Sequence, residues 1–168
     1  MNIEIVEATL AEKPVLGNLL ELYQHDFTEF DDNDVGDDGR FGYDYLDRYW
    51  IDEGRTPLLV RVDGKFAGFA LLKRGGHLVD EPGAMYVSEF FIMRKYRRRG
   101  VGAEVARRLF DRFPGRWEVA EMQKNTPAQA FWRRVIGDYT GGRFDERVFD
   151  DHRWRGPVQF FDNSSRAG

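Results

Sequence analysis

Positive charge and glycine are concentrated in one short segment, Arg94–Gly102, which reads RKYRRRGVG. Five of its first six residues are Lys or Arg, and two glycines follow one residue apart. The first N–H groups of a helix have no partner within the helix, and the helix dipole places partial positive charge beside them. Because glycine lacks a Cβ, an anion can approach such a backbone closely. This basic–glycine segment therefore predicts an anion site, suited to phosphate, at the start of a helix over residues 100–113.

Two other interpretations of the basic–glycine segment stay open. The basic residues could form a solvated helix start that binds nothing, or a patch that binds nucleic acid. Nucleic acid is disfavoured because the chain has 29 Asp and Glu against 25 Lys and Arg, a net charge of −4. The glycines also depart from two nucleotide-binding motifs, since no Gly-Lys-Ser/Thr follows them and position 105 is Val.

A strand and a second helix are expected to position this segment. Residues 84–93 (AMYVSEFFIM) form the most apolar strand pattern of the chain and end just before the basic residues. Downstream, Thr126, Pro127 and Gln129 predict a helix start, with Thr126 as the cap and Gln129 completing a capping box.

The remaining elements complete a mixed pattern. Leu16, Leu19, Leu20 and Tyr23 recur at the spacing of one helical face, and a short second helix is expected at 45–50. The chain then reads as β-α-α-β-β-β-α-β-α-β-β. We therefore expect a single α+β domain over 1–168, with a mixed central sheet of about six or seven strands and about four helices.

Composition limits the class of protein further. Apolar residues make up 42% of the chain and charged residues 32%, which is typical of a soluble globular protein. There is no Cys, and His25, His77 and His152 lack metal-ligand spacing, so no metal site is expected. No apolar run is long enough for a membrane span. The first residues lack the pattern of a secretory signal, so a cytoplasmic location is the default expectation.

Two motifs resemble the GNAT superfamily of acetyl-CoA-dependent N-acetyltransferases. RRRGVG at 97–102 matches the family signature R/Q-x-x-G-x-G/A, between a similar strand and a similar helix. NTPAQAFWRRVIGDY at 125–139 is similar to the second family motif, with an Asn, a small residue three positions later and an aromatic pair. The two motifs stand in the family's order, and the resemblance implies a GNAT-like domain over most of the chain.

The resemblance implies a site for acetyl-CoA as cosubstrate. Backbone amides would hold the pyrophosphate at Arg97, Arg98, Arg99, Gly100, Val101, Gly102 and Ala103. The pantetheine arm would pair with the strand at Phe91, Ile92 and Met93. Asn125 would hydrogen-bond that arm, and Trp132 would lie beside it. A helix-capping role is the alternative for Asn125.

Acetyl transfer to an amine requires an unprotonated amine, a donor for the carbonyl oxygen and a proton for the leaving sulfur. Glu89 is the candidate base, because a carboxylate in the most apolar strand should have a raised pKa. A structural ion pair with an Arg is the alternative for Glu89. The resemblance implies that the N–H of Ile92 or Met93 polarises the carbonyl and that a Tyr protonates the sulfur. Trp132 stands at that Tyr position and an indole is not a usable acid, so Tyr139 is the candidate replacement.

Acidic residues gather at 26–47, where nine Asp or Glu accompany only one basic residue, Arg40. The resemblance places the acceptor here, so a small cationic amine is one candidate substrate, and a solvated loop is the alternative. We therefore predict an N-acetyltransferase acting on a primary amine. The alternative is a catalytically weak module on the same fold that binds CoA or associates with nucleic acid. Aromatic residues in the last two strands could pack in a homodimer as easily as in the core.

Overall fold

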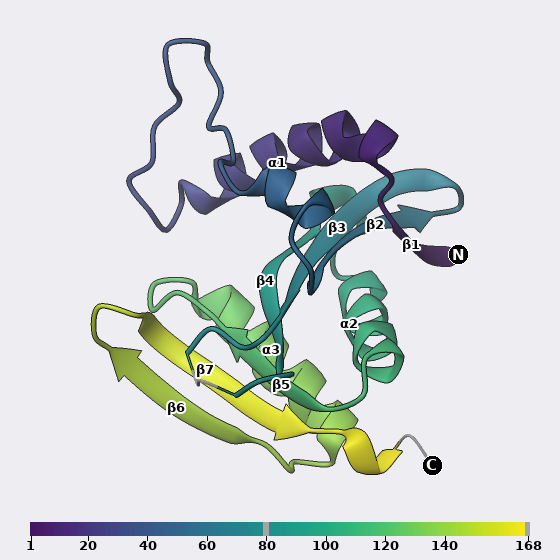
Figure 1. Cartoon of the computed structure of the whole chain (residues 1–168), viewed down its shortest axis with the longest axis vertical. Coiled ribbons are helices and arrows are strands. Elements are labelled where there is room, and N and C mark those ends of the chain that lie inside the picture. The colour runs from purple at the N-terminus through teal and green to yellow at the C-terminus, as the bar shows by residue number, and fades with distance from the viewer. Residues whose placement is uncertain (79–80, 167–168) are drawn as a thin grey trace.

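A seven-stranded sheet forms the centre of the computed structural model, which describes residues 1–78 and 81–166 (Figure 1). The strands lie in the order β1-β2-β3-β4-β5-β7-β6, and every neighbouring pair is antiparallel except β4 with β5. The expected α+β fold with a mixed sheet is confirmed. The strands are β1 Ile3–Glu7, β2 Arg55–Val62, β3 Lys65–Arg74, β4 Met85–Ile92, β5 Arg116–Ala120, β6 Asp145–Asp150 and β7 Arg155–Asp162.

Three α-helices flank the sheet within the described residues: α1 Lys13–Phe27, α2 Val101–Arg112 and α3 Thr126–Thr140. The fourth helix expected at 45–50 is instead a 3₁₀ helix, Leu46–Trp50. A segment this short closes too few i→i+4 hydrogen bonds to nucleate an α-helix, and Tyr49 is its only buried residue. None of the helices in residues 1–78 and 81–166 is long and apolar enough to cross a membrane.

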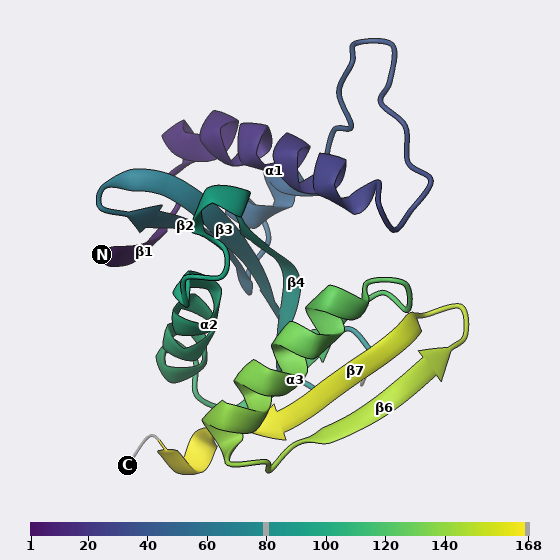
Figure 2. The same cartoon turned by 180° about the vertical axis from the view of Figure 1, so that it is seen from behind.

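The two faces of the sheet carry separate apolar clusters. Leu16 and Leu20 of α1 pack with Phe69 of β3 on one face. Phe110 of α2 packs against Trp117 of β5 on the other face, where α3 also lies (Figure 2). The helices of the basic–glycine segment and of the second motif therefore share one side of the sheet, and α1 lies on the opposite side.

β4 has strand partners on both sides over only a short part of its length. It pairs with β3 along the whole strand, but only Met85 and Tyr86 pair with β5. β4 and β5 then separate, so the sheet opens between them (Figure 2). A β-bulge at Ser88 adds one residue to β4 opposite β3, and such bulges bend a strand and re-aim its side chains.

A buried carboxyl group lies just beyond β5. Glu121 exposes 3% of its surface, and one of its carboxyl oxygens accepts a hydrogen bond from Gln159 Nε2 at 3.1 Å. The other carboxyl oxygen and the amide oxygen of Gln159 find no hydrogen-bond partner among the described residues. Burial raises the pKa of Glu121 to about 8, despite the hydrogen bond from Gln159. The fold therefore favours the neutral acid at this position.

Ionisation of Glu121 should destabilise the protein. The folded-state pKa lies above the ordinary value, so the folded protein holds the Glu121 proton more tightly than the unfolded chain does. The stability that this proton contributes is complete at low pH and is lost as the pH rises through about 8. Glu121→Gln removes the titration and keeps a neutral polar group. Between pH 4.5 and about 8, we expect the free energy of unfolding of the variant to rise relative to that of the wild type by up to about 1.4 kcal/mol per pH unit. Urea unfolding at pH 5 and pH 8.5 measures the difference, with the exposed Glu53→Gln as control. The same pH dependence in wild type and Glu121→Gln would contradict this account.

Candidate functional site

A cleft of about 840 Å³ lies where β4 and β5 separate. The end of α1, the end of β4 and the first turns of α2 and α3 line it. Met93, Arg99, Val101, Glu89 and Tyr139 are not among the lining residues. The lining includes nine of the residues that the sequence predicts to contact the cofactor: Phe91, Ile92, Arg97, Arg98, Gly100, Gly102, Ala103, Asn125 and Trp132.

The basic–glycine segment ends in the first turn of α2. Gly100 caps the helix with a φ of 79°, a left-handed conformation that glycine adopts without strain. The N–H of Glu104 donates to the Gly100 carbonyl at 3.0 Å, so the N–H groups of residues 101–103 precede the helix's own hydrogen bonds. An added Cβ at Gly102 would meet the ring of Phe131 at 3.3 Å. Gly102 thus makes room for α3 as well as for an anion, which the sequence alone did not indicate.

An acid of α1 engages two of the arginines of this segment. Asp26 accepts hydrogen bonds from Arg97 at 2.5 Å and from Arg94 at 2.8 and 3.1 Å. Partial burial would raise the pKa of Asp26, but the hydrogen bonds from the two arginines outweigh it and lower the pKa. Arg98 is exposed and lines the cleft. The positive charge of the segment is therefore divided between an internal ion-pair network and the cleft.

The end of β4 presents backbone groups to the cleft. Met93 N–H donates to the Ala67 carbonyl at 2.8 Å, which places it on the β3 side. Because the backbone N–H and C=O groups of successive residues point to opposite sides of a strand, those of Ile92 point away from β3. The Ile92 carbonyl accepts a hydrogen bond there from Arg97 Nε at 2.6 Å. Two N–H groups were expected to polarise a carbonyl. That of Ile92 faces the cleft, whereas that of Met93 is hydrogen-bonded to Ala67 of β3.

The first turn of α3 differs from the sequence prediction. The cap is Asn125 rather than Thr126, because the Asn125 side-chain oxygen accepts the N–H of Ala128 at 3.1 Å. Gln129 does not complete a capping box, since its amide donates to the carbonyls of Met122 and Gln123, at 3.0 Å each. The side-chain oxygen of Asn125 is thus used by the helix, and Asn125 also lines the cleft.

Two aromatic residues of α3 have separate environments. Trp132 lines the cleft and packs edge-on against Phe90 of β4, with ring centroids 5.0 Å apart. Tyr139 lies seven residues further along the helix, about 10 Å away at 1.5 Å per residue. Its hydroxyl donates to Asp111 at 2.8 Å and accepts a hydrogen bond from Asn163 at 3.1 Å. The structure therefore does not bring Tyr139 to the cleft, and the expectation that it protonates a leaving group there is corrected.

Glu89 follows the bulge of β4 and is part-buried. Its Oε2 accepts a hydrogen bond from Tyr23 at 2.5 Å and its Oε1 accepts one from Tyr43 at 3.0 Å. Burial raises the pKa of Glu89, although both hydrogen bonds act to lower it. Two tyrosines therefore pair with Glu89, and not the arginine that the alternative interpretation of Glu89 expected. The sequence predicted only that Tyr23 lies on one face of a helix. The one signal for its pairing with Glu89 was that the hydroxyl of a buried phenol needs a hydrogen-bond partner.

Residues 28–45, here called the acidic loop, connect α1 to the 3₁₀ helix and extend away from the sheet (Figure 1). Glu21 of α1 fastens the loop by accepting the N–H groups of Phe41 at 2.8 Å and Gly42 at 2.9 Å. Glu29 lines the cleft, as does Asp26 just before the loop. The other acids of the loop are mostly exposed. The acidic loop therefore lies next to the cleft but contributes little of its wall.

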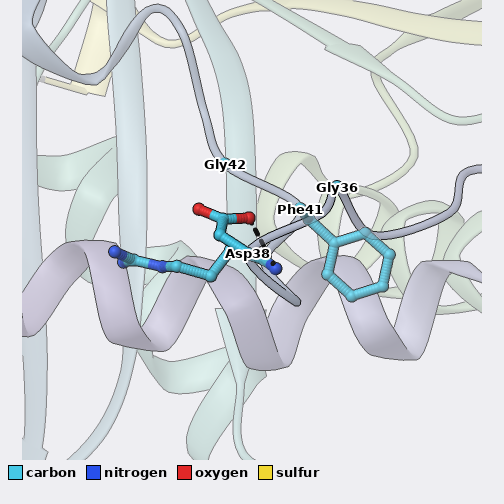
Figure 3. Close-up of a pocket in the computed structure, with 5 residues that line it drawn as sticks. Gly36, Asp38, Phe41 and Gly42 are labelled. Atoms are coloured by element: carbon cyan, nitrogen blue, oxygen red, sulfur yellow. Dashed lines mark hydrogen bonds between the residues drawn. The ribbon is translucent and has the colours of Figure 1, made fainter.

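A separate hollow lies within the acidic loop (Figure 3). Its lining comes entirely from residues 36–42, and the N–H of Arg40 donates to the Asp38 carboxylate at 3.1 Å. None of the candidate catalytic or cofactor residues lines it. Among residues 1–78 and 81–166, no three His, Cys, Asp or Glu side chains are grouped so that they could hold a metal ion. The cleft between β4 and β5, and not this hollow, holds the candidate cofactor residues.

Three solved structures have the same fold at low sequence identity. A histone acetyltransferase HPA2 and related acetyltransferase from Corynebacterium glutamicum has a TM-score of 0.70 at 17% identity, with 97% of each chain covered. Aminoglycoside acetyltransferase AAC(6')-Ib, in complex with coenzyme A, has a TM-score of 0.68 at 14% identity, covering 98% of this chain and 96% of that one. Spermidine N-acetyltransferase from Vibrio cholerae, in complex with CoA and spermine, has a TM-score of 0.65 at 11% identity, covering 99% and 98%.

Comparison by sequence gives the family. No curated protein matches the chain. The model of the acetyltransferase (GNAT) family matches residues 17–137, which is well over half of the chain and includes β4, α2 and most of α1 and α3. The elements that form the cleft are thus those that the family model covers, and the chain belongs to the acetyltransferase (GNAT) family.

Proposed function

We propose that this protein transfers the acetyl group of acetyl-CoA to the amine of a small molecule. The observation that carries the proposal is the cleft, which joins the open edge of β4 to the glycine-capped start of α2. Acetyl-CoA carries its thioester on a long arm that contains amides, and the arm leads to a pyrophosphate. The arm matches the open edge of β4, and the pyrophosphate matches the start of α2. The strand edge can pair with the amides of the arm, and the helix N-terminus can hold the phosphates.

The lining residues fit acetyl-CoA by their chemistry. The N–H groups of residues 101–103 and the guanidinium of Arg98 would hold the pyrophosphate. The open edge of β4 would run beside the pantetheine arm, with the Ile92 carbonyl held by Arg97 and the Ile92 N–H left for the acetyl carbonyl. The side-chain amide of Asn125 would donate a hydrogen bond to the arm. Phe131 and Trp132 would form an apolar wall for the arm. Arg97 would act indirectly, since its side chain holds the Ile92 carbonyl and Asp26.

The reaction joins an amine nitrogen to the acetyl carbon and breaks the carbon–sulfur bond. The N–H of Ile92 is placed to stabilise the negative charge that develops on the carbonyl oxygen. Glu89 is the proposed proton acceptor, because it is the single acid of β4, three residues before Ile92, and burial raises its pKa. Exclusion of water by the aromatic walls would strengthen both interactions.

A small cationic amine is the proposed class of acceptor. Glu29 lines the α1 side of the cleft and the acidic loop continues from it, whereas Asp26 on that side is already paired with Arg94 and Arg97. A surface of this sign raises the local concentration of cations. Two of the three structural neighbours are named for spermidine and aminoglycosides, both of which are cationic amines, and this supports the same class here.

The direct test is a panel of amines incubated with acetyl-CoA, with release of the CoA thiol and the mass of the product as readouts. We expect turnover with polyamines or aminoglycosides and little with neutral aromatic amines. Binding of acetyl-CoA by calorimetry without turnover of any amine would refute transfer and favour a CoA-binding module. Absence of acetyl-CoA binding would refute the assignment of the cleft.

Gly102, at the start of α2, should matter more to acetyl-CoA binding than the charge of Arg98 does. Gly102→Val should weaken acetyl-CoA binding at least about 100-fold, because a branched side chain would displace Phe131 and cover the backbone N–H groups. Arg98→Ala should weaken it less than about fivefold, because an exposed charge is screened by solvent. Calorimetry on both variants measures the two effects.

A matched control adds the same side chain elsewhere. Gly137→Val places it in α3, outside the cleft lining, where a Cβ makes only an ordinary contact at 3.7 Å with Phe144. Circular dichroism confirms that each variant is folded. If folded Gly102→Val binds acetyl-CoA as tightly as Gly137→Val does, the start of α2 is not the phosphate site.

A further inference from the structure

The Glu89 carboxylate is separated from the cleft by a phenol. Tyr23 and Tyr43 each donate a hydrogen bond to it, one to each carboxyl oxygen. Tyr23 is among the residues that line the cleft, whereas Glu89 and Tyr43 are not. A group bound in the cleft therefore meets Tyr23 before it meets Glu89.

Aromatic packing fixes the Tyr23 ring in this position. Its centroid lies 4.4 Å from that of Phe27, 5.6 Å from that of Phe69 and 5.8 Å from that of Phe91. The three rings come from α1, β3 and β4, so the phenol is held from three elements on its side of the sheet. Its hydrogen bond to Glu89, at 2.5 Å, fixes the direction of the O–H.

The protonation states suit transfer of a proton. Burial and the neighbouring Glu89 charge raise the pKa of Tyr23 well above its usual range, so the phenol keeps its proton at neutral pH. A hydroxyl has one proton to donate and two lone pairs that accept. Tyr23 can therefore donate to Glu89 while its oxygen accepts from a group in the cleft.

We propose that Tyr23 is the catalytic residue that contacts the reacting atoms, and that Glu89 acts through it as the acceptor of one proton. The inference rests on the proposed acetyl transfer and names the group that moves the proton in both of its steps. Trp132, at the other wall of the cleft, cannot do this, because an indole N–H is not an acid at neutral pH. Tyr139 is held elsewhere by Asp111 and Asn163.

The atoms and charges balance along this route. The amine enters neutral, and as its nitrogen bonds to the acetyl carbon its proton passes to the Tyr23 oxygen while the Tyr23 proton passes to Glu89 Oε2. The carbon–sulfur bond breaks with its electron pair on sulfur. Glu89 then returns its proton to Tyr23, and Tyr23 gives one to the sulfur. The products are an amide and a thiol, and both side chains regain their starting states.

The surroundings of Glu89 favour this route over others. Phenols from four elements interact with it. Tyr23 of α1 and Tyr43 of the acidic loop act on its pKa, and its charge acts on Tyr49 of the 3₁₀ helix and Tyr86 of β4. Burial raises the pKa of each of them, so all four are neutral near pH 7. Of the four, only Tyr23 both donates to Glu89 and lines the cleft.

The first experiment compares two matched phenol deletions in the full chain. Tyr23→Phe should lower kcat at least about 100-fold, the scale of general acid–base catalysis. Its dissociation constant for acetyl-CoA should change less than about threefold, because the ring contacts remain. Tyr43→Phe removes the other hydrogen bond to Glu89 and should lower kcat less than about tenfold. The double variant Tyr23→Phe/Glu89→Gln should be no slower than the slower single variant, because the two residues act on one proton.

The second experiment does not depend on turnover. If Tyr23 contacts the sulfur, its oxygen can accept the S–H of bound CoA, because its own O–H points to Glu89, but it meets a thiolate unfavourably. Affinity for CoA relative to desulfo-CoA should therefore fall between pH 7 and 9, as the thiol ionises. In Tyr23→Phe this fall should be lost, and in Tyr43→Phe it should remain. Calorimetry with the two ligands at both pH values measures it.

The outcomes separate this inference from the proposed function. A Tyr23→Phe protein that keeps its kcat within a few fold, or one no slower than Tyr43→Phe, overturns the role of Tyr23 while transfer stands. Wild type without turnover of any amine overturns the transfer itself, and the CoA and desulfo-CoA comparison then decides whether Tyr23 contacts the sulfur. The same pH dependence in wild type and Tyr23→Phe means that it does not.

Discussion

The end of β4 has a strand on only one side, and the rest of the site is arranged around that constraint. A buried backbone N–H or C=O without a partner costs about 1–3 kcal/mol, so an open strand edge inside a protein needs partners other than a strand. Arg97 supplies one of them by donating to the Ile92 carbonyl. Asp26 holds Arg97 in turn, which ties α1 to the loop that begins α2. A ligand with amides of its own can supply others, which is why the cleft suits an arm that resembles an added strand.

The alternation of β4 assigns a different task to each side of the sheet. Phe90 packs with Trp132 of α3, and Phe91 packs with Tyr23 of α1. The bulge just before them places Glu89 on the α1 side, with Tyr23 and Tyr43. A partly buried carboxylate is stable only when its oxygens are hydrogen-bonded, and the two phenols meet that need without adding charge. The acid thus keeps a raised pKa beside the cleft, which an arginine partner would have prevented.

Local patterns predicted the elements of the site but not the contacts between them. The apolar run of β4 and the glycines of α2 have signals within a few residues, and both were found where expected. Tyr23 and Glu89 are 66 residues apart, and Asp26 and Arg97 are 71 apart, so no periodicity connects them. The cap of α3 was misassigned because Asn and Thr are adjacent and both can cap, and backbone geometry chose Asn125. Tyr139 lies about two turns beyond Trp132 along α3 and is not among the residues that line the cleft, which no local pattern could indicate.

Under the proposed function, the positive charge at α2 and the acidic loop would act on different ligands of one cleft. Asp26 takes up Arg94 and Arg97, so the attraction for a phosphate at the start of α2 comes from the backbone dipole and from Arg98, both local in their effect. The acidic loop begins two residues after Asp26, and its acids are mostly exposed, so they can act on cations. An anionic cofactor and a cationic acceptor can then be drawn to the same cleft from different directions. Asp26 neutralises Arg94 and Arg97 between α1 and the loop before α2, which leaves the exposed acids of the acidic loop and the start of α2 to act on ligands of opposite sign.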